Sequence, residues 1–536
     1  MEIIPRRIVF MILPIVKKCT ENAEICAVPK RITYSYSCEL GKLGAEAFAS
    51  FNCGAEKAER EAFIEFFFDA ELDARDEIYR VSVAADRIKV GFRDARGAVN
   101  GAATVALLLR KNEVKSCEIV DYPSCGYRSF LLDMARGLPS EDDIKETIKY
   151  MALAKYNRLH LHLIDSRGPC YASEALPEYK YTGESEMCDI AFLREIDRLC
   201  ESYAIEIVPE LEIPAHSTAV CAAHPEFKCP VEGNAGWAIC PAGEEVWEFY
   251  GKLVAELADI FKHSEYIHIG TDELEFGDLD IKYHCFWDEC PRCAELRARE
   301  GITDRQGEFY YVANRIFEII KSNGKKMMMW NDQIDVSKDV PLSREILIEF
   351  WRIAYPGRGP HEGCTFNGFL EKGFKVINAH YPSTYLDQNK YLSTEKMKTW
   401  TPLNSPEQSP EYAAQVIGGE TCAWEFGNYS GYPFYGVVTP PVLGVFGDKL
   451  WGLGEREYND EYEAAMAEYI FGTAERTDVF ECFGNMIPPR NVDFLTYHAE
   501  EDLPLEKIAH CISVFETDGG WVAQKYASWM KKLLKS

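Results

Sequence analysis

Short apolar runs alternate with amphipathic segments over most of the chain. From residue 127 onward there are eight such runs, each of a length that suits a buried strand. The eight runs are residues 127–135, 158–165, 204–213, 266–273, 325–332, 345–351, 375–382 and 415–424. Several intervals between them hold helical patterns: residues 141–156 place Ile144, Ile148 and Met151 on one face behind a candidate N-cap, Ser140. Eight strand–helix units over about 300 residues predict a (β/α)8 barrel.

The alternative is a doubly wound open sheet. That fold would need a glycine-rich phosphate loop after its first strand, and the sequence has none there. Before the barrel, residues 78–92 alternate like a hairpin and residues 95–110 predict a helix, so residues 1–122 are expected to form a small α+β supporting domain. The barrel is assigned to residues 123–455, closed by a helix after the last strand. Residues 456–536 are expected to be a helical extension packed on it.

Composition narrows the function classes. With 47% hydrophobic residues the 536-residue chain can bury a large core, and its net charge of -28 disfavours nucleic acid as a partner. The 19 cysteines are odd in number, so they cannot all pair, which favours a reducing compartment. Residues 1–19 resemble a weak secretory signal without a convincing cleavage site, and we interpret them as a first strand. We therefore expect a cytoplasmic protein, with secretion left open, and no membrane span.

Polar and aromatic side chains follow nearly every predicted strand. In a (β/α)8 barrel the functional residues lie at these carboxyl ends. A nearly complete ring is hard to explain as a solvated face. The ring comprises Asp133, Arg136, Asp165, His216, Asp272, Glu273, Trp330, Asp332, Trp351, Tyr385, Asp387, Trp424 and Glu425.

Asp272 and Glu273 are adjacent, which is unusual for two residues meant to share a site. Neighbours in a strand point to opposite faces, so both can face one site only where the strand ends. Two nearby acids push their pKa values apart, as glycoside hydrolysis requires. A solvated strand end with a capping Asp is the alternative. Aromatic residues at four other strand ends, namely Trp330, Trp351, Tyr385 and Trp424, would form an apolar box suited to a sugar ring or a small acyl group.

Two patterns raise the question of a metal. His160 and His162 lie on one face of a predicted strand, as in metal-dependent barrel amidohydrolases, but we expect them to be satisfied inside the barrel. Cys285, Cys290 and Cys293 include one Cys-x2-Cys pair, which zinc knuckles use. Because no second such pair exists, reduced thiols are favoured over zinc.

The successive motifs "YRSFLLDMARG", "HLHLID", "IVPELEIPAHS", "YIHIGTDE", "MMMWND" and "GGETCAWE" resemble those of glycoside hydrolase family 20, the β-N-acetylhexosaminidases, in order and spacing. The match covers roughly residues 120 to 455, and the N-terminal unit resembles the small domain that precedes the barrel in that family. The resemblance implies an exo-acting enzyme without a cofactor. It would remove terminal N-acetylglucosamine or N-acetylgalactosamine from a small-molecule or oligosaccharide substrate.

The resemblance also implies substrate-assisted retaining catalysis, in which the 2-acetamido oxygen of the sugar is the nucleophile. Glu273 matches the general acid/base, Asp272 the carboxylate that orients the acetamido nitrogen, and Tyr385 the phenol that binds its oxygen. The remaining matched residues are substrate-binding: Arg128, Asp165, His216, Trp330, Trp351, Asp387, Trp424 and, less directly, Glu425.

The sequence departs from the family at three places. The usual Gly-Gly-Asp-Glu reads Gly270-Thr271-Asp272-Glu273, the segment after Asp165 reads "SRGPCY", and the last strand ends Trp424-Glu425-Phe426. These departures concern substrate specificity more than chemistry. Three alternatives to the β-N-acetylhexosaminidase stay open. These are a glycan-binding barrel without catalysis, an ordinary retaining glycosidase using Glu210, Glu349 or Glu420 as nucleophile, and the metal-dependent amidohydrolase.

Overall fold

The structure is a computed structural model and describes residues 12–469 with gaps. The gaps are residues 53, 59–60, 112, 180–186, 276–279, 353–362, 387–399, 405, 407, 425–434, 455–461, 463–464 and 467–468. Of the expected C-terminal extension, residues 456–536, only four residues are described, so that prediction lies almost wholly outside the described residues. Among the helices that are described, none is both long enough and apolar enough to span a lipid bilayer.

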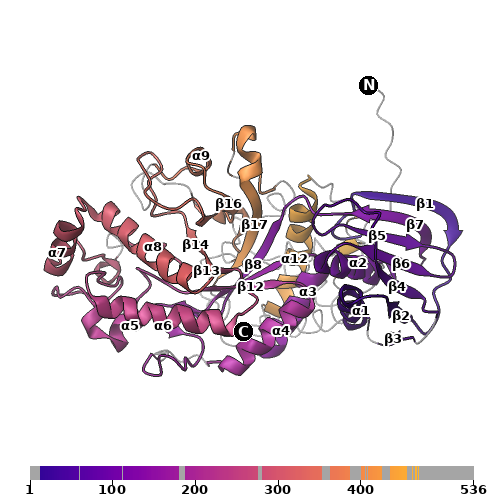
Figure 1. Cartoon of the computed structure of the whole chain (residues 1–536), viewed down its shortest axis with the longest axis horizontal. Coiled ribbons are helices and arrows are strands. Elements are labelled where there is room, and N and C mark those ends of the chain that lie inside the picture. Colours follow the sequence, from indigo (N-terminus) through magenta and orange to yellow (C-terminus); the bar gives the residue numbers. More distant parts are fainter. Residues whose placement is uncertain are drawn as a thin grey trace, which may run out of the picture.

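A seven-stranded sheet forms the N-terminal part, in the order β1-β7-β5-β6-β4-β2-β3. Helices α1 and α2 pack against each other and against this sheet (Figure 1). Residues 12–17 precede β1 and contribute no strand, so the expected first strand begins only at Lys18. The elements are β1 (Lys18–Ile25), β2 (Thr33–Tyr36), α1 (Glu39–Phe51), β3 (Glu56–Lys57), β4 (Ile64–Phe68), β5 (Tyr79–Val83), β6 (Ile88–Phe92), α2 (Ala95–Leu108) and β7 (Lys115–Asp121).

Eight parallel strands then close into a barrel, in the order β8-β9-β12-β13-β14-β15-β16-β17. Each lies within one of the eight predicted apolar runs, so the expected (β/α)8 barrel preceded by a small α+β domain is confirmed. The barrel strands are β8 (Tyr127–Asp133), β9 (Arg158–His162), β12 (Glu206–Glu210), β13 (Tyr266–His268), β14 (Lys326–Trp330), β15 (Leu347–Phe350), β16 (Val376–Asn378) and β17 (Val416–Ala423).

Helices and short elements connect the strands (Figure 1). They are α3 (Glu141–Leu153), β10 (Ile164–Asp165), β11 (Gly168–Pro169), α4 (Ile190–Ser202), α5 (Thr218–Ala223), η1 (Pro225–Phe227), α6 (Glu244–Ile260), η2 (Ile281–Tyr283), α7 (Pro291–Glu300), α8 (Arg305–Ser322), α9 (Phe366–Glu371), α10 (Tyr381–Thr384), η3 (Pro410–Gln415) and α12 (Tyr435–Gly452). Helix α3 begins as predicted, because the Ser140 side chain accepts a hydrogen bond from the backbone N–H of Asp143.

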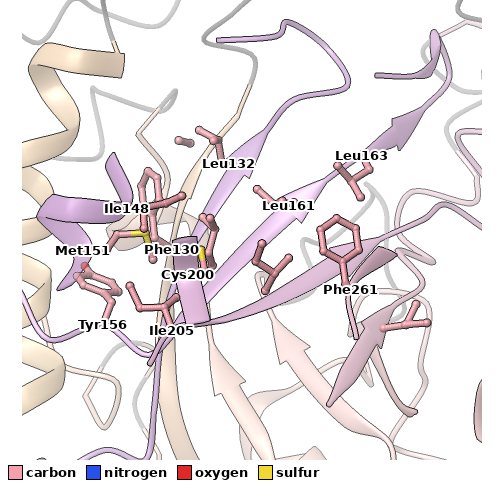
Figure 2. Packing of buried hydrophobic residues seen from close by; sticks show 14 of the residues in the cluster. Phe130, Leu132, Ile148, Met151, Tyr156, Leu161, Leu163, Cys200, Ile205 and Phe261 are labelled. Carbon is pink, nitrogen blue, oxygen red and sulfur yellow. The ribbon is translucent and has the colours of Figure 1, made fainter. Parts of the chain in front are cut away.

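The outer faces of the strands and the inner faces of the helices share one apolar core. Figure 2 shows Phe130 and Leu132 of β8 beside Ile148 and Met151 of α3, with Leu161 of β9 close by. All five side chains are buried. Since alternate residues of β8 and β9 point outward, this packing directs the residues between them toward the barrel axis.

Buried charges join the N-terminal sheet to the bottom of the barrel. Asp121, at the end of β7, is fully buried and accepts hydrogen bonds from Tyr79 Oη (2.7 Å), Trp451 Nε1 (2.9 Å) and Lys155 Nζ (3.1 Å). These donors come from β5, α12 and the turn after α3. The Asp121 carboxylate thus connects the supporting sheet to two segments of the barrel domain, one near the beginning of its sequence and one near the end.

We predict that Asp121→Asn lowers the free energy of unfolding by about 3–5 kcal/mol, because the substitution leaves the buried Lys155 ammonium without its counter-charge. Urea denaturation followed by tryptophan fluorescence measures this. Asp73→Asn is the control, since Asp73 is half-exposed and its ion pair is with the half-exposed Arg75. Equal free energies of unfolding for the two variants would contradict a stabilising role of the buried Asp121–Lys155 pair.

Candidate active site

The two adjacent carboxylates follow a tight turn at the end of β13. The strand stops at His268, and Gly270, Thr271 and Glu273 have φ angles of 63°, 83° and 55°. A Cβ at Gly270 would lie 1.8 Å from Glu212 Oε2, so any other residue there would have to displace the Glu212 carboxylate and adopt a positive φ. Because the backbone turns instead of continuing as a pleated strand, Asp272 and Glu273 do not alternate between two faces.

His216 contacts both acids. Its Nε2 lies 3.6 Å from Asp272 Oδ2 and 3.6 Å from Glu273 Oε2, while its Nδ1 lies 3.0 Å from Asp165 Oδ2. Asp165 is also bound by Arg136 Nη2 at 2.8 Å. Strand ends far apart in sequence therefore meet at one histidine, as the sequence predicted for Asp165, His216, Asp272 and Glu273.

Asp332 holds the next strand end in place. Its Oδ2 accepts a hydrogen bond from the backbone N–H of Glu273 at 3.0 Å, and its Oδ1 accepts one from Trp351 Nε1 at 3.1 Å. The sequence placed Asp332 at a strand end but gave it no role. Its contacts make it the link between the acid pair and the aromatic residues.

Trp237 is a site residue that the sequence analysis missed. It lies in the long connection between β12 and α6, where no strand-end rule applies. Its Nε1 donates a hydrogen bond to the carbonyl of Glu273 at 3.0 Å, and its ring lies 4.4 Å from the His216 ring, centroid to centroid. Trp237 thus fixes both the backbone of Glu273 and the orientation of His216.

The four expected aromatic residues do converge. Trp424 lies 6.0 Å from both Trp330 and Tyr385, and Tyr385 stacks on Trp351 at 6.1 Å with 12° between the rings. Arg136 lies over the Trp424 ring at 5.3 Å. An aromatic cluster and a cluster of acids therefore occupy the same carboxyl end of the barrel.

Burial and charge set the proton affinities of the pair. Burial, reinforced by Asp332 and Glu273, raises the pKa of Asp272 to about 7 despite the opposing effect of His216. Burial also opposes ionisation of Glu273, but the contact with His216 outweighs it and the pKa of Glu273 is lowered. Burial disfavours a charged His216, yet Asp272 and Asp165 outweigh it and the pKa of His216 lies well above its usual range. These shifts favour a charged His216 and place the proton of the carboxyl pair on Asp272 rather than on Glu273.

Below this site the barrel interior is filled by paired charges. Glu210 accepts hydrogen bonds from Trp330 Nε1 at 2.8 Å and contacts His162 and His268. Burial is outweighed by the surrounding carboxylates, which raise the pKa of His160 to about 10 and of His162 to about 9. His160 and His162 thus pair through Nδ1 with the buried carboxylates of Glu420 and Glu210, as expected, while the Nε2 atom of each makes no hydrogen bond with a described residue.

The structure contradicts the role given to Arg128. As the second residue of β8 it lies at the amino end of the barrel, opposite the site, and its side chain is buried. It pairs with Glu77 of the N-terminal domain and donates to the carbonyls of Lys155 and Cys125. Arg136, three residues past the end of the same strand, is the arginine at the site. The motif contains both arginines, and only the strand direction separates them.

The cysteine prediction is also corrected. Cys290 and Cys293 do lie in a cluster, but their neighbours are Cys229 and Cys240, and Cys285 is not part of it. The partners lie about 50 to 60 residues earlier in the chain, so sequence spacing could not reveal them. Asp387 and Glu425 lie outside the described residues, and their predicted roles stay predictions.

Comparison with known proteins identifies relatives of this arrangement. The sequence model of the family described as "Glycosyl hydrolase family 20, catalytic domain" matches residues 125–427. A beta-hexosaminidase from Akkermansia muciniphila is 27% identical over 319 residues, 53% of this chain and 63% of that protein. Beta-hexosaminidase subunit A1 from Dictyostelium discoideum is 26% identical over 65% of each chain. The chain thus spans just under two thirds of the length of these relatives.

Solved structures agree on the fold. The GH20 exo beta-N-acetylglucosaminidase of Vibrio harveyi superposes with a TM-score of 0.72 at 21% identity, over 85% of this chain and 76% of that one. The Streptomyces plicatus N-acetyl-beta-hexosaminidase gives 0.69 at 20% identity, over 86% and 95%. With the family match covering more than half of its length, the chain belongs to glycosyl hydrolase family 20.

Proposed function

We propose that this protein is an exo-acting β-N-acetylhexosaminidase that uses the 2-acetamido group of its substrate as the nucleophile. The observation that carries the proposal is the pair Asp272 and Glu273, which follow one turn and contact one histidine, beside an aromatic cluster. A retaining enzyme with a protein nucleophile places its two carboxylates on opposite sides of the scissile bond. Adjacent carboxylates suit a reaction whose nucleophile arrives with the substrate.

Asp272 has an acceptor to offer the acetamido nitrogen. Its Oδ1 is buried and accepts no hydrogen bond from any described residue. A buried acceptor without a donor is costly, and an incoming N–H group would relieve that cost. The aromatic side chains of Trp330, Trp351 and Trp424 would enclose the acetyl methyl group, with the Tyr385 hydroxyl bound to the acetamido oxygen.

The reaction then needs two steps. In the first, Glu273 gives its proton to the glycosidic oxygen while the acetamido oxygen bonds to the anomeric carbon and the aglycone leaves. The positive charge that develops on the acetamido nitrogen is stabilised by ionised Asp272. In the second, Glu273 takes a proton from water, and the water oxygen bonds to the anomeric carbon while the bond from that carbon to the acetamido oxygen breaks. The anomeric carbon is thus inverted twice, so its configuration is retained.

Substrate binding would also move the proton to the residue that uses it. In the unliganded site Asp272 is the better base, since its pKa is raised and that of Glu273 is lowered. An N–H group donated to Asp272 favours its ionised form, so the shared proton passes to Glu273. Only a correctly placed acetamido sugar would thus transfer the proton to Glu273 and make it the general acid.

The alternatives fit less well. Glu210, Glu349 and Glu420 are fully buried among His160, His162 and His268, so none is placed to attack a substrate. A metal-dependent amidohydrolase would lose its activity in the presence of a chelator, and this separates it from the proposed reaction. A barrel that only binds glycans would not need the acid pair, and a hydrolysis assay separates it from the enzyme.

Arg136 would take the role first given to Arg128. It lies at the site, bound to Asp165 and over Trp424, and it can donate to hydroxyls of the terminal sugar. Asp387 and Glu425 are proposed to contact the outer hydroxyls of the same sugar. We also propose a reducing compartment such as the cytoplasm, because no two cysteines among the described residues form a disulfide.

Glu273→Gln tests the proposal with two chromogenic substrates, a β-N-acetylglucosaminide and the matching β-glucoside. Wild type should hydrolyse only the acetamido sugar, and the variant should lose at least about 100-fold in kcat/KM because it has no proton to give. Glu275→Gln is the matched control, since Glu275 lies on the same loop but pairs with His284 and Arg305.

Equal hydrolysis of both sugars by wild type would contradict the substrate-borne nucleophile. Binding of N-acetylglucosamine without hydrolysis of either substrate would instead support the glycan-binding barrel.

The pH profile gives a second prediction. Catalysis requires one proton on the acid pair, and burial raises the pKa of Asp272 to about 7, so kcat/KM should fall above about pH 7. His216→Asn removes the cation that favours the ionised carboxylates. The pKa of the pair should then rise, and the alkaline limb should move up by about 1 pH unit or more.

Profiles of kcat/KM between acid and alkaline pH measure this shift. His263→Asn is the control, because His263 is half-exposed and contacts Asp197 and Glu201, away from the site. An alkaline limb that stays in place in His216→Asn would show that His216 does not tune the pair.

A further inference from the structure

Four cysteines from two distant parts of the chain meet in the interior. Cys229 and Cys240 lie in the connection between η1 and α6, and Cys290 and Cys293 lie at the start of α7. All four sulfurs lie within 4.8 Å of one another, and all four residues are buried. No other group of described residues that could share a metal ion is made only of sulfur ligands.

The spacing of the sulfurs matches a known coordination geometry. The Sγ–Sγ distances are 3.7 Å for Cys240 and Cys293, 3.8 Å for Cys229 and Cys293, and 3.9 Å for Cys240 and Cys290. Zn²⁺ bound by four thiolates at about 2.3 Å has tetrahedral edges of about 3.8 Å. A disulfide needs about 2.05 Å, and Cys240 approaches two partners equally instead of pairing with one.

The surroundings suit the charge that such a centre carries. Zn²⁺ with four thiolates has a net charge of about -2, which a buried site must offset. Cys290 is the N-cap of α7 and Cys293 lies in its first turn, where the helix dipole favours anions.

From this geometry we propose a structural zinc site formed by Cys229, Cys240, Cys290 and Cys293. Binding releases the four thiol protons, and no coordination position remains for a substrate, so the ion takes no part in the reaction. The proposal is independent of the proposed function.

The site would tie together the two loops that support Glu273. The loop of Cys229 and Cys240 carries Trp237, whose Nε1 donates to the carbonyl of Glu273. The loop after β13 carries Glu273 itself and leads to Cys290. Trp287 Nε1 already donates across the same boundary to the carbonyl of Ile239 at 2.7 Å. An ion at the cluster would fix the relative position of the loops at a second point.

Metal analysis of the purified full-length protein tests the proposal. Wild type should contain about one zinc ion per chain after exhaustive dialysis, and Cys293→Ala should contain almost none. Cys285→Ala is the matched control, because Cys285 is equally buried on the same segment but is not in the cluster, and it should keep its zinc.

A second measurement needs no variant. Wild type produced with cobalt in place of zinc should show the intense d–d bands of tetrahedral, thiolate-bound Co²⁺, and these should disappear when a mercurial reagent modifies the thiols. The cobalt spectrum decides the question if Cys293→Ala does not fold. A protein without metal, equal zinc in the two variants, or iron in the site would each overturn the proposal.

Discussion

The turn after β13 is the constraint on which the active site depends. In a regular strand Asp272 and Glu273 would point to opposite faces, and one of them would face the surrounding helices instead of the site. Positive φ angles at Gly270, Thr271 and Glu273 remove that alternation. For Thr271, a β-branched residue, such a conformation costs about 1–3 kcal/mol, so the surrounding contacts must impose it.

Those contacts come from every neighbouring strand end. The Thr271 hydroxyl donates to the carbonyl of Trp330, the backbone of Glu273 is held by Asp332 and Trp237, and His216 contacts both carboxylates. Beneath them the buried charges around Glu210 orient Trp330 from the inside. The network that stabilises this strained turn thus also positions the aromatic cluster. It therefore sets the relative positions of the two carboxylates and the aromatic side chains.

The sequence predicted the fold well because a (β/α)8 barrel is made of local signals. Each barrel strand is a short apolar run, and helices such as α3 carry their own caps. The strand-end rule also located Asp165, His216, Asp272 and the aromatic residues. The same rule selected Arg136, whereas the resemblance assigned the sugar-binding role to Arg128. The motif contains both arginines, and only the direction and length of β8 decide which one reaches the site. Trp237 and the Cys229–Cys240 pair lie in long connections, whose paths depend on tertiary contacts and not on periodicity.

The central claim is that this turn serves a nucleophile supplied by the substrate. It is tested most directly with a series of N-acetylglucosaminides whose acetyl group carries zero to three fluorine atoms. Each fluorine withdraws electrons from the carbonyl oxygen, so kcat/KM should fall steeply and progressively along the series. A kcat/KM that stays level across the series would mean that the acetamido oxygen does not attack, and the roles assigned to Asp272 and Glu273 would then be wrong.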